Sequence, residues 1–160
     1  MRYVKAELTR EGTFSDPTAY LEKLPTLAAS LPAGARAFAT DPEHYNYGGL
    51  RCVKDLKPQT LTSGDDESWL ELSFRHNCWK HDDDLTIRYN GVSHLTMDPS
   101  GEVAQLQDVM LDEILPDEQG CKHEIACISG SLIITCKDLS ATWTPSNCSE
   151  SEQPGCVRGG

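Results

Sequence analysis

CKHEIACISGSLIITCKDLSATW, residues 121–143, has the pattern of a β-hairpin and indicates the fold class of the chain. Two runs rich in β-branched and small apolar residues, 124–128 and 132–136, flank a short polar break at 129–131. Glycine adopts positive φ without steric cost, so Gly130 in this break predicts a tight turn. The second run is apolar on both faces, which predicts a central strand covered on both sides. We expect the rest of the chain to pack around this hairpin.

Other segments predict further strands of an antiparallel sheet. Residues 69–74 and 85–89 alternate between apolar and polar side chains, as half-buried strands do, and Asn90-Gly91 is a strong turn signal. Weaker patterns predict strands within 1–9, 35–39, 50–56, 92–97 and 103–115, and a polar loop at 57–67. From residue 69 onwards, the five or six strands separated by turn signals are typical of an antiparallel sheet system.

One helical region is predicted near the N-terminus. Asp16 can cap a helix whose first residue is Pro17, and an apolar stripe at helical spacing runs to Leu31. Pro25 predicts a kink or two short helices, and Pro32 to Gly34 would end the element. The predicted fold is therefore α+β: a mainly antiparallel β-sheet, as a sandwich or half-open barrel, with an N-terminal helical segment. We expect a single globular domain over 1–144 and a disordered tail over 145–160, because the tail has almost no apolar residues.

The charge of the chain is strongly negative and uneven. The net charge is −11; residues 1–57 are close to neutral, and residues 58–160 hold nearly all of the excess acid. Nucleic acid is therefore not expected as a partner, because phosphate binding requires local positive charge. We expect no membrane association, since no apolar run approaches the roughly 18 residues of a spanning helix. The first residues have no apolar signal segment, which predicts a cytoplasmic location.

The seven cysteines do not predict a complete disulfide framework, because their number is odd and no secretion signal is present. Cys127 and Cys136 fall in strand-like runs and are expected to be buried thiols. Cys148 and Cys156 lie in the tail and could form a bridge in an oxidising environment.

Acidic side chains suggest a docking surface for a basic protein partner. Charge complementarity speeds the encounter of two proteins, and an exposed aromatic side chain can anchor the contact. The residues predicted for this surface are Asp82, Asp83, Asp84, Trp79, Asp112, Glu113, Asp117 and Glu118. A solvated acidic face without any partner is the alternative explanation.

A zinc site is the second hypothesis. Imidazole and thiolate groups are the usual zinc ligands, and four of them can form a structural site while three leave a position open for catalysis. The candidate ligands are His76, Cys78, His81, Cys121 and His123. Their spacing matches no strong zinc motif, so solvated loop histidines are the competing interpretation.

No catalytic motif is present in the sequence. It contains no G-x-S-x-G elbow, no GxGxxG, no Walker A and no HExxH. The pattern favours a protein without catalytic activity and with no cofactor other than zinc.

Residues 79–92, WKHDDDLTIRYNGV, resemble an element of small uncharacterised bacterial β-sheet proteins, some of which are similar to immunity proteins of polymorphic toxin systems. In that element a His-Asp pair precedes an alternating strand and a glycine-containing turn. The resemblance covers about 15 residues and transfers no functional residue. It implies a cytoplasmic β-sheet protein that binds and blocks a toxin. The leading hypothesis is thus a small acidic binding protein of the immunity type; the alternative is a metal-binding protein or metal-dependent enzyme.

Overall fold

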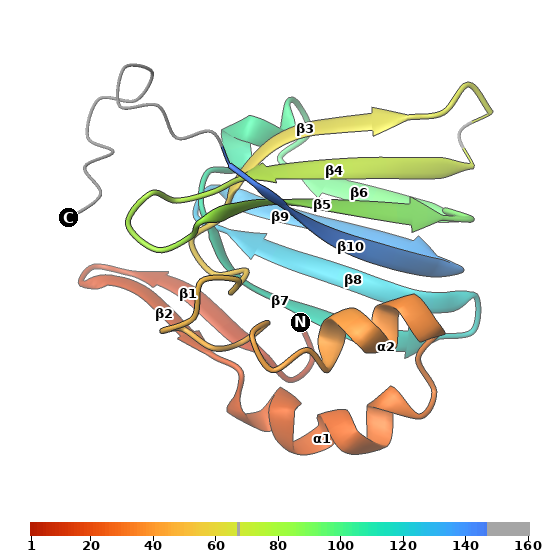
Figure 1. The fold of residues 1–160 in the computed structure, drawn as a ribbon, viewed down its shortest axis with the longest axis horizontal. Coiled ribbons are helices and arrows are strands. Elements are labelled where there is room, and N and C mark those ends of the chain that lie inside the picture. The colour runs from red at the N-terminus through yellow and green to blue at the C-terminus, as the bar shows by residue number, and fades with distance from the viewer. Residues whose placement is uncertain (67, 147–160) are drawn as a thin grey trace.

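The computed structural model describes residues 1–66 and 68–146, which form ten β-strands and two α-helices (Figure 1). The elements are β1 Lys5–Thr9, β2 Gly12–Asp16, α1 Thr18–Ala28, α2 Ala33–Ala39, β3 Lys57–Ser63, β4 Trp69–Arg75, β5 Asp83–Asn90, β6 His94–Asp98, the 3₁₀ turn η1 Val103–Leu106, β7 Val109–Asp117, β8 Gly120–Cys127, β9 Gly130–Cys136 and β10 Asp138–Pro145. All strand pairs are antiparallel. The predicted α+β class with a mainly antiparallel sheet is confirmed.

Two four-stranded sheets pack face to face and enclose the core. One sheet has the strand order β10-β5-β4-β3 and the other has the order β6-β9-β8-β7. Alternate side chains of β4 and β8 are buried between the two sheets, as in a β-sandwich. At one corner the sheets are linked by the backbone: Asp55 N donates to Val109 O at 2.9 Å, and Val109 N donates to Leu56 O at 2.8 Å.

The β8–β9 hairpin forms where the sequence predicts it. Cys127 pairs with Gly130 at the turn, and β9 lies between β6 and β8, so it is a central strand. Its inward residues Leu132 and Ile134 are buried, whereas the outward Ile133 is only half-buried. The prediction that both faces of this strand are covered is therefore wrong, because the outward side chain of Ile133 stays partly exposed.

Two helices follow the N-terminal β1–β2 hairpin and lie along the lower edge of the sandwich in Figure 1. Helix α1 continues through Pro25, and Pro32 precedes a second helix, α2, rather than ending the element. The strand predicted for 35–39 is wrong. Ala35, Phe38 and Ala39 are buried at the i, i+3, i+4 spacing of a helix, and they pack α2 against β10.

Several other segments differ from the predictions. Residues 50–56 form turns and bends instead of a strand. Their apolar side chains Val53 and Leu56 are buried in the core although the backbone that carries them is irregular. Residues 57–63, predicted as a loop, form the edge strand β3, where mostly polar side chains are compatible with exposure. Strands β2 and β10 were not predicted. The expected tail, together with Cys148 and Cys156, lies outside the described residues except for Pro145 and Ser146.

The helices of the described residues contain 11 and 7 residues, and neither is long and apolar enough to cross a membrane. The buried hydrophobic side chains form one continuous core between the sheets and beneath the helices.

Candidate functional site

A cluster of polar side chains centred on Asp112 lies inside the sandwich. Asp112 on β7 is only 1% exposed, and its carboxylate contacts His44 Nε2 at 2.8 Å and His123 Nε2 at 2.7 Å. The second ring nitrogen of His44 lies 2.8 Å from Phe38 O, and that of His123 lies 2.8 Å from the Tyr89 hydroxyl. The cluster therefore connects the segment after α2 with both sheets.

The hydrogen-bond partners indicate the charges of this cluster. The two ring nitrogens of His44 face a backbone carbonyl and the Asp112 carboxylate, both of which are hydrogen-bond acceptors. His123 lies between the Asp112 carboxylate and the Tyr89 hydroxyl, which can either donate or accept. Burial raises the pKa of Asp112, but the adjacent His44 and His123 outweigh this effect and leave that pKa below its ordinary value. The cluster is thus a buried carboxylate held by two histidine rings.

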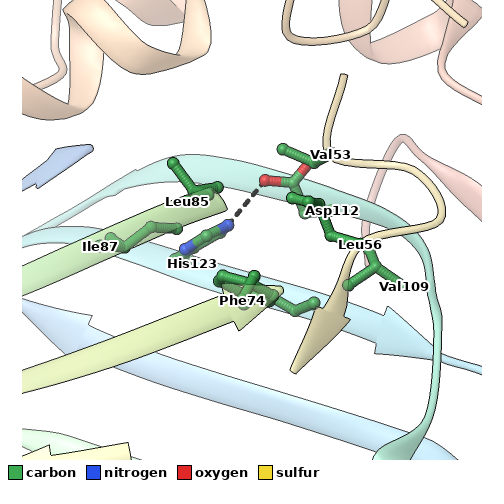
Figure 2. A pocket seen from close by; sticks show the side chains of 9 residues that line it. Val53, Leu56, Phe74, Leu85, Ile87, Val109, Asp112 and His123 are labelled. Carbon is green, nitrogen blue, oxygen red and sulfur yellow. Dashed lines mark hydrogen bonds and ion pairs between the residues drawn. The ribbon is translucent and has the colours of Figure 1, made fainter. Parts of the chain in front are cut away.

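The cluster has no room for a substrate. Figure 2 shows Asp112 and His123 bonded to each other among apolar side chains such as Phe74 and Leu85. The cavity beside them has a volume of about 10 Å³, close to the minimum that holds one water molecule. The arrangement can hold the chain segments together, but it offers no surface at which another molecule could react.

The predicted zinc ligands do not meet. Among the residues that the structure describes, no group of three or more His, Cys, Asp or Glu side chains could hold a metal ion. His76 Nδ1 contacts Asp84 at 2.7 Å, His81 Nε2 contacts Cys52 O at 2.7 Å, and Cys78 is disulfide-bonded. The ring nitrogens of these histidines are thus bonded to protein groups.

The other two candidate ligands are in β8. Cys121 faces Cys136, with 3.6 Å between their sulfurs, and His123 belongs to the Asp112 cluster. These contacts use the same atoms that would have to bind zinc.

Two of the predicted docking residues are in the interior. Asp112 belongs to the buried cluster, and Glu113 is 2% exposed. The Glu113 carboxylate accepts hydrogen bonds from the backbone N–H groups of residues 2–4 at 2.6 to 2.8 Å, which fastens this segment to the outer face of β7. Their prediction as surface residues is wrong, because both faces of this part of β7 are covered.

The remaining acidic residues lie at opposite ends of the sandwich. Asp117 and Glu118 are exposed in the β7–β8 turn, at the right of Figure 1, and the β4–β5 loop is at the left. This turn adjoins the C-terminal end of β5. Gly120 lies against the backbone of Lys137, whose N–H donates a hydrogen bond to the carbonyl of Asn90, the last residue of β5. Asp83 is the first residue of the same strand. The acidic residues of the turn and those of the β4–β5 loop are therefore separated by the length of β5, which has 8 residues at about 3.3 Å each. The single acidic face that the sequence suggested is therefore not formed.

Trp79 is the most exposed large hydrophobic side chain among the described residues, at 77%. It lies in the β4–β5 loop, which is held at both ends. His76 bonds to Asp84 through its backbone N–H and its ring, and His81 Nδ1 accepts a hydrogen bond from Asn77 N at 3.0 Å. Burial lowers the pKa of His81, so its ring is neutral and Nε2–H donates to Cys52 O.

A neighbouring segment extends this surface. Tyr47 and Leu50 are exposed in the segment that follows α2. Lys80 Nζ lies 5.6 Å from the centre of the Tyr47 ring, and Arg51 contacts Asp83 at 3.0 Å. We call Tyr47, Leu50, Trp79, Asp82 and Asp83 the Trp79 surface. Trp79, Asp82 and Asp83 were identified from the sequence. Tyr47 and Leu50 were not, because their segment is distant in sequence and contacts the β4–β5 loop only in the folded chain.

A comparison with known protein families and with curated proteins finds no match to this chain.

Proposed function

We propose that this chain is a protein-binding domain without catalytic activity, and that it contacts a basic partner protein through the Trp79 surface. The observation that carries the proposal is a tryptophan that is 77% exposed on a loop fixed by internal hydrogen bonds. Tryptophan is enriched among the residues that dominate binding energy, and a rigid anchor loses little conformational freedom on binding.

The charge of the chain favours a basic partner. The net charge is −11, and Asp82 and Asp83 follow Trp79 by three and four residues in the chain. Such a field raises the association rate of an oppositely charged protein and acts less at high salt. Asp83 is paired with Arg51, so part of its contribution is to position the surface rather than to attract a partner.

An inhibitor of the immunity-protein type is the form of binding protein that we favour, acting in the cytoplasm on a basic toxin. Support comes from the interior cluster: the side chains best suited to catalysis are buried and hydrogen-bonded to one another, which leaves surface contact as the mode of action. The predicted zinc chemistry is less favoured, since the candidate ligand atoms already have protein partners.

The test is a comparison of proteins captured by the immobilised wild-type chain and by Trp79→Ala, quantified by mass spectrometry. We expect a basic protein that is lost with Trp79→Ala and retained with Leu95→Ala, a control that truncates another exposed apolar residue on β6. A captured partner should then be purified and its activity measured with and without the chain. Equal retention by wild type and Trp79→Ala would contradict the proposal.

A charge-matched pair tests the electrostatic part. Asp82→Asn should weaken binding and its dependence on salt, whereas Asp117→Asn, which removes an exposed carboxylate at the opposite end of the sandwich, should not. Equal effects of the two substitutions would indicate that only the overall charge matters.

A further inference from the structure

Two cysteines face each other at the open end of the β8–β9 hairpin. Cys121 on β8 and Cys136 on β9 are directly opposite in the strand register, and their sulfurs are 3.6 Å apart. Both are fully buried, and both are free thiols. Cys127 is also free, but it lies opposite Gly130 and therefore has no thiol across from it.

We propose that Cys121 and Cys136 are a modification site: they join as a disulfide when the chain folds in the presence of an oxidant of the small-molecule disulfide class.

The backbone is already suited to this bond. Directly opposite residues in an antiparallel pair have Cα atoms about 4.5 to 5.5 Å apart, within the range of about 4.4 to 6.8 Å that disulfides span. The sulfurs need to approach from 3.6 Å to about 2.05 Å, which rotation of the side chains can provide. Strands β8 and β9 therefore do not have to separate or shift in register.

The chemistry limits when the bond can form. The facing Cys136 thiol and burial both raise the pKa of Cys121, so the folded protein holds little Cys121 thiolate. Thiolate is the reactive species, and an oxidant cannot reach a fully buried pair. We therefore expect oxidation while the chain folds, before the second sheet covers the hairpin.

The reaction is two successive thiol–disulfide exchanges. The thiolate of one cysteine attacks the small-molecule disulfide, forms a mixed disulfide and releases one thiolate of the reagent. The other cysteine then attacks the mixed disulfide and releases the second. Cys121 and Cys136 lose two protons and two electrons in total, and the reagent is reduced to two thiols.

Peptide mapping tests this pairing directly. The full chain carrying Cys127→Ser is refolded from denaturant with reduced and oxidised glutathione, alkylated and digested with trypsin. Cleavage after Arg88, Lys122 and Lys137 places Cys121 alone in peptide 89–122 and Cys136 alone in peptide 123–137. We expect these two peptides to be linked, with a mass about 2 Da below the sum of their thiol forms. Separate alkylated peptides, or Cys121 linked to another cysteine, would overturn the proposal.

A thermal measurement on the same samples is independent of the mapping. The two cysteines are 15 positions apart in sequence, so their bond should contribute about 6 to 12 °C to the Tm difference between the oxidised and the reduced chain. Cys78 also forms a disulfide and contributes separately, so the difference should become smaller by that amount in Cys121→Ala and stay unchanged in Cys52→Ala, which removes another buried free thiol. If Cys127→Ser does not fold, the wild-type chain is mapped by fragmentation of the linked peptides. A Tm difference in Cys121→Ala as large as that in Cys52→Ala would count against the pairing.

Discussion

Asp112→Asn should be the most informative single substitution in this protein. The carboxylate is the only acidic partner that the structure gives to His44 and His123 in the interior cluster. The amide has nearly the same shape, so the substitution changes charge and leaves packing almost intact. The carboxylate contacts one ring nitrogen of His44 and one of His123, and an amide replaces one of its two acceptor oxygens by an N–H₂ group.

The expected cost follows from burial. Removing one partner of a buried ion pair destabilises proteins by about 3 to 5 kcal/mol, because the other charge is left without compensation. Native proteins have unfolding free energies of about 5 to 15 kcal/mol, so this cost is a large share of the total. For a chain of this size, it corresponds to a decrease in Tm of about 6 to 20 °C.

The assay is urea unfolding followed by tryptophan fluorescence, on wild type, Asp112→Asn, His44→Gln and the double variant. The coupling energy from this cycle should be at least about 1 kcal/mol, since the two side chains are in contact. Asp117→Asn, in the exposed β7–β8 turn, is the control and should change stability by less than about 0.5 kcal/mol.

The pH dependence supplies a second check on the same variant. The lowered pKa of Asp112 means that the unfolded chain binds its proton more readily than the folded chain. Its contribution to stability is therefore complete above the ordinary aspartate pKa of 3.8 and decreases as the pH falls below that value. The difference between wild type and Asp112→Asn should shrink in the same range. A loss below about 1 kcal/mol at neutral pH, or a difference that grows in acid, would refute this role of the buried Asp112 carboxylate.

Three further outcomes are expected. Because the pKa of His81 is lowered in the folded chain, the unfolded chain binds the proton first, and stability should fall as the pH decreases below 6.5. Urea titrations at pH 7 and pH 5 should therefore show a smaller loss of stability in His81→Asn than in wild type. Glu113→Gln should cost about 1.5 to 3 kcal/mol and accelerate amide hydrogen exchange at residues 2–4, which lose charge-assisted hydrogen bonds; unchanged exchange there would contradict this role. Gly120→Ala should lower the Tm more than Gly12→Ala, because both glycines have positive φ, but only at Gly120 would the new Cβ lie 2.4 Å from backbone carbonyl oxygens; equal losses would mean that backbone strain alone decides.

The part of the fold that could be predicted is the part with a strong local period. Residues 69–75, 83–90 and 120–136 alternate between buried and half-buried positions for most of their length, so their strands were found. Residues 33–39 were misread because Ala-Gly-Ala-Arg-Ala carries little pattern, and only contact with β10 selects the helix. Strand β3 was missed because an edge strand with exposed threonines has the composition of a loop.

The candidate site was less accessible to sequence reasoning. Trp79 and the adjacent aspartates could be identified because they are contiguous. The contact of His44 with Asp112 spans 68 positions and has no local signal. Acidic residues are rarely fully buried, so Asp112 and Glu113 were assigned to the surface; that assumption fails on β7, whose two faces are both covered.

The position of the histidines has one consequence for how this protein can change. The segment that carries Tyr47 and Leu50 has no regular secondary structure, and it is secured from within by His44 and by the carbonyl of Cys52, which His81 binds. Among the outward side chains of this segment, Arg51 contacts Asp83 and the Tyr47 hydroxyl donates to Ser15 O, whereas Leu50 is 54% exposed. Leu50 and Trp79 can therefore be exchanged for other residues with little effect on folding, so the identity of what is recognised can vary independently of the scaffold.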